Sequence, residues 1–191
     1  MSSTNNLVWR RRVNVLKSHV NGRLQDAEKP TISLNDVSAQ KEARTELRML
    51  ENEDYDKGFL LILSQLATVG DVSKDMFKKR MEHMKNTQNT YFTVVVEDLD
   101  KKKIIATASL IVELKFAHGC SKVGHIEDVV VDETYRGYKL GKRVIEELKS
   151  IATKQGCYKT ILDCSEKNVP FYQSCGFVKK ELQMRFDNPH E

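Results

Sequence analysis

The segment from His125 to Lys142, HIEDVVVDETYRGYKLGK, constrains the fold more than any other part of the sequence. Ile126–Val131 is apolar enough for a buried strand, and a helix that contains Gly141 is predicted to begin near Lys139. The first turn of a helix has unpaired backbone N–H groups and a partial positive charge, and small residues there let a phosphate approach. The pattern therefore favours a phosphorylated ligand, and an ordinary solvated helix start is the alternative.

Basic residues surround this predicted helix start: Arg136, Lys139, Lys142 and Arg143. The GxxxxGK[ST] pattern of nucleoside-triphosphate loops and the GxGxxG pattern of dinucleotide-binding folds are both absent from the sequence. The expected ligand is therefore a phosphorylated cofactor of another kind.

Hydrophobic periodicity along the chain predicts an α+β fold with a mixed, mostly antiparallel sheet flanked by helices. The predicted strands are 46–50, 91–97, 104–115, 124–131, 158–164 and 177–186. The predicted helices are 55–68, one that begins after the N-cap Ser73, 140–153 and 168–174.

The length of 191 residues suits one domain with a tail, and we expect an arm or linker over 1–44 and one domain over 45–191. The arm places Trp9, Val13 and Leu16 at helical spacing and has no acidic residue before Asp26. Such a start suits a mitochondrial presequence or a membrane-surface helix, although a loose arm without catalytic importance is the simpler interpretation.

Composition excludes several classes of protein. The 31 basic and 27 acidic residues give a net charge of +4, which is too small and too evenly mixed for a nucleic-acid-binding protein. No apolar run approaches the ~20 residues of a membrane span. The four cysteines lack CxxC and zinc-site spacing, so we expect reduced thiols in a cytoplasmic protein, with targeting by the arm as the alternative.

Three stretches carry a resemblance to a known family: HIEDVVVD (125–132), RGYKLGK (136–142) and GCYKTILDCSEKNVPFYQSCGF (156–177). The chain resembles the Gcn5-related N-acetyltransferase (GNAT) family, whose coenzyme loop has the consensus Arg/Gln-x-x-Gly-x-Gly/Ala. Lys139 departs from that consensus. The stretches are most similar to the eukaryotic glucosamine 6-phosphate N-acetyltransferases within the family, which tolerate this departure.

The resemblance implies the GNAT acyl-CoA N-acyltransferase fold over 45–191, with acetyl-CoA as co-substrate and no metal. It implies acetyl transfer to the amine of D-glucosamine 6-phosphate, which gives N-acetyl-D-glucosamine 6-phosphate and CoA for UDP-N-acetylglucosamine biosynthesis. It also implies a homodimer whose sugar sites are shared between chains.

Coenzyme-binding residues follow from the resemblance: Glu127, Asp128, Val129, Arg136, Gly137, Tyr138, Lys139, Leu140, Gly141, Lys142, Asn168 and Tyr172. The strand is bulged in the family, and the N–H near Val129 is the implied catalytic oxyanion donor. Adjacent carboxylates point to opposite faces of a strand, so we expect at most one of Glu127 and Asp128 to face the substrate directly. A salt-bridged strand end is the alternative for both.

Two further catalytic roles are implied by the resemblance. Asp163 accepts a hydrogen bond from the sugar amine and orients it, and Tyr172 protonates or hydrogen-bonds the departing thiolate. A core aromatic paired with Phe171 is the alternative for Tyr172. Cys164 follows Asp163 directly, and we hypothesise that it forms a mixed disulfide with the coenzyme under oxidation.

Substrate-binding residues are implied in the same way: Thr68, Lys115, His118, Glu127, Asp128, Tyr158, Lys159, Asp163 and Arg185. By the resemblance, Arg185 corresponds to an arginine that reaches the sugar phosphate across the dimer interface. The family threonine that contacts the sugar falls at Ala67 or Thr68. The alternatives are a GNAT acetyltransferase for a polyamine or protein lysine, and a silent acyl-CoA-binding module.

Overall fold

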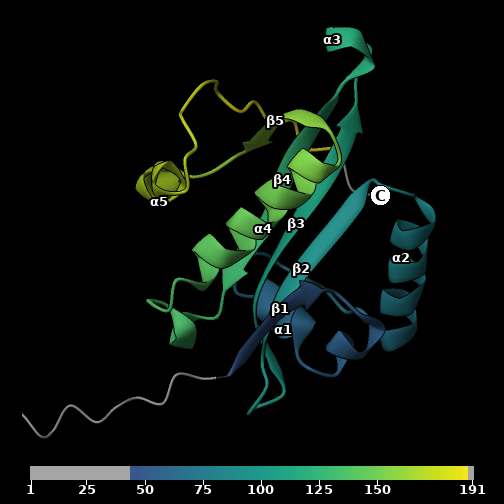
Figure 1. Ribbon diagram of the computed structural model, residues 1–191. Helices are drawn as coiled ribbons and strands as arrows, with labels where there is room; N and C mark the ends of the chain where they lie inside the picture. Colours follow the sequence, from purple (N-terminus) through teal and green to yellow (C-terminus); the bar gives the residue numbers. More distant parts are fainter. Residues whose placement is uncertain (1–43, 189–191) are drawn as a thin grey trace, which may run out of the picture. The chain divides into compact units, whose positions relative to one another are not determined.

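The computed structural model describes residues 44–188, which contain a five-stranded sheet in the order β1-β2-β3-β4-β5 (Figure 1). The strands are β1 (Thr45–Met49), β2 (Tyr91–Asp98), β3 (Lys103–Leu114), β4 (Lys122–Val131) and β5 (Cys157–Leu162). Neighbouring strands are antiparallel except β4 and β5, which are parallel. The predicted fold class is confirmed, and the amphipathic start around Trp9 lies outside the described residues.

The helices pack on both faces of this sheet. They are η2 (Asn52–Tyr55), α1 (Phe59–Leu63), α2 (Lys74–Asn86), α3 (Ala117–Cys120), η3 (Glu133–Tyr135), α4 (Leu140–Lys154), η4 (Glu166–Asn168) and α5 (Val169–Ser174). Ser73 caps α2 by accepting a hydrogen bond from the Met76 N–H, as predicted.

Two apolar clusters divide the core. The α4 side chains Leu140, Val144 and Leu148 recur at helical spacing and are buried in the cluster that contains Val94. Side chains of α1 and α2 pack in the second cluster with Val95. Because successive strand residues point to opposite faces, α4 covers one face of the sheet and α1 and α2 cover the other.

The helix predicted over 55–68 is wrong in extent. Gly58, with a φ of 82°, separates η2 from the five-residue α1. Beyond α1, Gln65 and Leu66 donate to carbonyls three residues earlier, so the chain continues in tight turns. A left-handed residue cannot continue an α-helix, and it divides the apolar run that suggested one long element.

The strand predicted over 177–186 is also wrong. Residues 177–188 form neither helix nor strand, and their side chains Val178, Leu182, Met184 and Phe186 are exposed. A strand needs a hydrogen-bonding neighbour, and within residues 44–188 this segment pairs with none. Between β3 and β4 the chain forms the short turn α3, where His118 and Gly119 have positive φ angles.

A buried ionic network fixes η2 to the sheet. Arg48 of β1 donates to both oxygens of Asp54 at 2.7 Å and to Glu97 of β2 at 2.5 Å, and Lys57 donates to Glu97 at 2.7 Å. Burial raises the pKa of the Glu97 carboxyl, but the hydrogen bonds from Lys57 and Arg48 outweigh it and lower the pKa overall. The fold therefore depends on Arg48 to compensate two buried carboxylates.

Replacing Arg48 with alanine should lower the free energy of unfolding at neutral pH by about 3–5 kcal/mol, because it leaves buried negative charge undercompensated. The folded-state pKa of Glu97 is depressed, so its stabilising contribution is present above its ordinary pKa and is lost as pH falls through the folded value. Urea unfolding should therefore show a smaller loss at acidic pH.

The matched control is Arg44→Ala, which removes an exposed arginine paired with Asp100 at 2.6 Å. Exposed pairs contribute little, so this variant should unfold much like the wild-type protein. Equal losses in the two variants would contradict the role given to Arg48.

Candidate active site

A β-bulge interrupts β4 at the middle of the site. Ser109 of β3 pairs with Glu127, but Thr107 pairs with Val130, so Ala108 faces two residues of β4. The extra residue is Asp128, whose φ is 53°. The bulge leaves Asp128 and Val129 outside the regular ladder, which agrees with the bulged strand that the resemblance implied.

Core packing on both sides accounts for the bulge. Ile126 is buried in the α4-side cluster, whereas Val130 is buried in the cluster of α1 and α2. Residues four apart in a regular strand share a face. One extra residue between them reverses the alternation, so that both side chains are buried on opposite faces.

A pocket of about 490 Å³ lies beside the bulge. It is lined by Arg80, His83, Met84, Tyr91, Ser109, Ile111, Glu127 and Asp128. Both Glu127 and Asp128 line this pocket, because the bulge breaks the strand alternation that would direct adjacent side chains to opposite faces.

Sequence reasoning missed the α2 wall of this pocket. Arg80 and His83 are three residues apart on α2, so they share a face, and both line the pocket while Phe77 and Met81 are buried. The amphipathic pattern of α2 was a usable signal for an outward cationic face. It did not reveal that this face lies over the β4 carboxylates.

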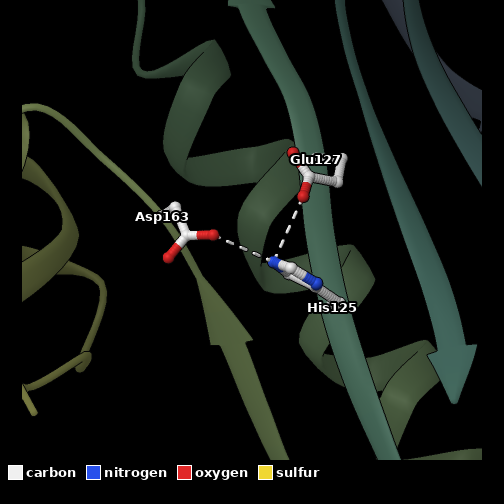
Figure 2. A group of neighbouring side chains, drawn as sticks. All are labelled: His125, Glu127 and Asp163. Carbon is white, nitrogen blue, oxygen red and sulfur yellow. Dashed lines mark ion pairs between the residues drawn. The ribbon is translucent and has the colours of Figure 1, made fainter. Parts of the chain in front are cut away.

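Three side chains of β4 and β5 meet next to the pocket (Figure 2). His125 Nε2 lies 3.1 Å from Glu127 Oε1 and 3.5 Å from Asp163 Oδ2. Asp163 Oδ2 also accepts a hydrogen bond from Gln183 Nε2 at 3.1 Å. Ligand atoms of the three residues lie within 4.8 Å of one another, which is close enough to hold a single cation. Sequence reasoning identified both carboxylates but not His125 or Gln183.

The start of α4 has no side-chain cap. Its N-cap residue Lys139, with a φ of 59°, makes no side-chain capping bond. Four predicted coenzyme residues before the helix are exposed, as is Lys142: Arg136, Gly137, Tyr138 and Lys139. Leu140 is buried, and Arg143 instead donates to Thr45 Oγ1 at 2.8 Å. An uncapped helix start with free cations can hold a phosphate group.

Gly141 lets α5 approach α4 closely. A Cβ atom at this position would lie 3.1 Å from Phe171 Cζ, so a side chain would push α5 away. This contact brings Tyr172 of α5 to the side of the sheet where β4 and β5 separate after their last pair, Ile126 with Leu162.

Tyr172 is buried and packs against Phe171, with ring centroids 4.9 Å apart. This packing agrees with the alternative in which Tyr172 is a core aromatic paired with Phe171. Burial raises the pKa of its hydroxyl, and nearby Cys164, Cys175 and Glu127 raise it further. The hydroxyl is therefore a proton donor at neutral pH. Asn168 is exposed at the start of α5.

The structure brings three of the predicted sugar-site residues together near the turn between β3 and β4. The His118 and Tyr158 rings are 4.3 Å apart, and Lys159 Nζ lies 5.6 Å from the Tyr158 ring centroid. The other predicted residues do not join them through any contact within residues 44–188. Lys115 pairs with Glu113, Arg185 pairs with Asp187, and Thr68 is exposed between α1 and α2.

All four cysteines are free, and Cys164 is exposed beside Asp163. Among residues 44–188, none of the helices has both the length and the apolar character that crossing a membrane requires.

Comparison with known proteins identifies relatives of this chain. A Dictyostelium discoideum protein named glucosamine 6-phosphate N-acetyltransferase 1 is 50% identical over 137 residues, which cover 72% of this chain and 87% of that protein. The Arabidopsis thaliana glucosamine 6-phosphate N-acetyltransferase is 44% identical over 138 residues, with 72% and 93% covered.

A crystal structure of glucosamine-6-phosphate N-acetyltransferase from Arabidopsis thaliana matches with a TM-score of 0.74 at 42% identity, over 75% of this chain and 98% of that one. The profile described as the acetyltransferase (GNAT) family matches residues 48–177. The resemblance read from the sequence is confirmed: this chain belongs to the acetyltransferase (GNAT) family.

Proposed function

We propose that the protein transfers the acetyl group of acetyl-CoA to the amine of D-glucosamine 6-phosphate. The products are N-acetyl-D-glucosamine 6-phosphate and CoA, a step towards UDP-N-acetylglucosamine. The observation that carries the proposal is the bulge of β4, which lies between an uncapped cationic helix start and a pocket with paired carboxylates. The names of the two relatives above support this acceptor.

Acetyl-CoA binds, in this proposal, along the α4 side of the bulge. The N–H groups at the start of α4, with Arg136, Lys139 and Lys142, hold the pyrophosphate. The pantetheine arm lies where β4 and β5 separate, and Asn168 contacts the coenzyme. The Val129 N–H, released from the ladder by the bulge, polarises the thioester carbonyl.

The acceptor amine attacks in its neutral form. Asp163 orients it by accepting one N–H, while Glu127 and Asp128 line the acceptor pocket. A bond forms between the amine nitrogen and the carbonyl carbon, the Val129 N–H stabilises the oxyanion, and the C–S bond then breaks. The amine proton leaves to solvent, Tyr172 gives a proton to the thiolate, and the resulting phenolate regains a proton from solvent. Positioning supplies much of the rate, because the attacking amine and the thioester are held together.

The sugar phosphate binds to cations in this proposal: Lys115, His118, Lys159 and Arg185. Because Arg185 does not contact the other three within one chain, it would act from the partner of a homodimer, and Thr68 would contact the sugar. The exposed apolar side chains of residues 177–188 and the open edge of β5 support such a dimer. Free thiols at all four cysteines support a cytoplasmic location.

The acceptor can be tested by thiol release from acetyl-CoA with three amines. Glucosamine 6-phosphate should give a kcat/KM at least about 100-fold above that of glucosamine, because a buried or shared phosphate contact contributes several charge-assisted hydrogen bonds. Spermidine should be a poor acceptor, because it has no phosphate for the proposed cations to bind and because Arg80 in the pocket wall repels a polycation. Equal kcat/KM values for the two sugars would refute the proposed substrate. If no amine caused thiol release, the result would favour a catalytically inactive acyl-CoA-binding module.

The acid role of Tyr172 is tested by Tyr172→Phe, which removes only the hydroxyl. The kcat should fall by about 100-fold, the lower end for a general acid, because a thiolate is a fairly good leaving group. The KM values for both substrates should change little.

The matched control is Tyr55→Phe, which removes a hydroxyl that donates to Val72 O at 3.1 Å in the α1–α2 region. This variant should keep its kcat. A Tyr172→Phe enzyme with unchanged kcat and a raised KM would assign Tyr172 to binding alone.

A further inference from the structure

His125 is the one member of the β4–β5 cluster to which the proposed reaction gives no role. Figure 2 shows its imidazole directed between the carboxylates of Glu127 and Asp163, with Nε2 as the atom that both approach. Nε2 is buried, yet it makes no well-aligned hydrogen bond to either oxygen. A buried polar atom that faces two carboxylates needs a physical explanation.

Strand register explains why these three side chains meet. Gly124 pairs with Thr160 and faces Ala152 of α4, so His125 and Glu127 point to the opposite face. His125 pairs with Ile161 on the parallel strand β5, and Asp163 follows two residues later on the same face. The convergence is thus built into the sheet before the bulge begins.

The contacts leave one oxygen of each carboxylate available. His125 approaches Glu127 through Oε1, and both His125 and Gln183 approach Asp163 through Oδ2. Glu127 Oε2 and Asp163 Oδ1 make no hydrogen bond or ion pair within residues 44–188. Each carboxylate is therefore held from one side and free on the other.

His125 lies between two carboxylates that repel each other. Solvent screens this repulsion only in part, because the Glu127 and Asp163 side chains are 44% and 39% exposed. An imidazole whose Nε2 carries hydrogen attracts both carboxylates. Arg80 and His83 line the same pocket as Glu127, whose lining does not include Asp163. Loss of the imidazole would let Asp163, which follows β5 and is half exposed, turn towards solvent.

We propose that His125 is a positioning residue: it holds Glu127 and Asp163 so that their free oxygens converge on the acceptor amine. The inference rests on the proposed acetyl transfer, but it adds a residue that is neither the proposed acid, Tyr172, nor the proposed oxyanion donor, Val129. It predicts that His125 acts through Asp163 on the acceptor half of the reaction and leaves the coenzyme half unchanged.

The first test measures steady-state kinetics of His125→Ala with glucosamine 6-phosphate. The acceptor kcat/KM should fall by about 10–100-fold, the size of effect expected from a slightly misplaced reacting group. The KM for acetyl-CoA should stay within about twofold of the wild-type value, because the start of α4 is untouched. Added imidazole, which can occupy the truncated site, should restore part of the acceptor kcat/KM.

The control is Thr160→Ala, which removes a half-buried polar side chain from β5 on the α4 face of the same strand pair. It should leave both kinetic constants near their wild-type values. A similar fall in Thr160→Ala would show that any change in these strands impairs the enzyme, and this would overturn the proposal.

The second test is a double-mutant cycle with Asp163→Asn. If His125 acts through Asp163, His125→Ala should cost much less in the Asp163→Asn background than in the wild-type enzyme. Additive losses would overturn the proposal. Extensive chelation of the wild-type enzyme should leave kcat unchanged, whereas a loss of kcat restored by a divalent cation would show that the three residues hold a metal instead.

These outcomes are distinct from failure of the proposed function. If the wild-type enzyme does not acetylate glucosamine 6-phosphate, the substrate is wrong, and the cycle can be measured with whichever amine is acetylated. If the wild-type enzyme acetylates this sugar and the His125→Ala variant has the same acceptor kcat/KM, only the positioning role is overturned.

Discussion

The bulge at Asp128 is the constraint on which the rest of the site depends. A positive φ costs a non-glycine residue on the order of 1 kcal/mol, so it persists only where the surroundings require it. Here the requirement is the burial of Ile126 against α4 and of Val130 against α1 and α2. Without the extra residue, one of these two apolar side chains would point towards solvent instead of the core. Core packing therefore holds the strained backbone that presents the Val129 N–H.

The same bulge separates the two halves of the proposed reaction. Before it, β4 is paired with β5 and carries His125 and Glu127 on the pocket face. After it, β4 runs into the turn that leads to α4, where Lys139 and its neighbours present positive charge. An anionic coenzyme and a cationic or neutral amine are thus drawn to different ends of one strand, and their reacting groups meet at the bulge.

The sequence predicted the elements of the sheet well because each strand and α4 has its own local pattern. It failed where the outcome depends on distant parts of the chain. Residues 177–186 alternate like a strand, but within residues 44–188 no strand pairs with them. The helix predicted after Tyr55 failed for a local reason, because Gly58 divides the apolar run. Local patterns state what a segment can form, and only tertiary contacts decide whether it does.

The candidate site also contains residues that the sequence identified and residues that only the folded structure brings out. The α4 start was predicted from the local pattern of residues, whereas Asp163 and Tyr172 were predicted from a resemblance. The structure buries Tyr172 in the apolar cluster on the α4 side of the sheet. Arg80 and His125 were missed because their significance lies in which strand or helix they face. An arginine on an amphipathic helix and a histidine in a strand are each ordinary in sequence.

Burial favours the protonated form of the Tyr172 hydroxyl. Burial, with Cys164, Cys175 and Glu127 nearby, raises the pKa of the Tyr172 hydroxyl, so the group keeps its proton until a stronger base appears. A thiolate released at the bulge is such a base only when it is close and poorly hydrated. Burial is the largest of these effects on the Tyr172 pKa, and Glu127 adds to it, so a carboxylate that lines the proposed acceptor pocket also favours the protonated form of the proposed acid.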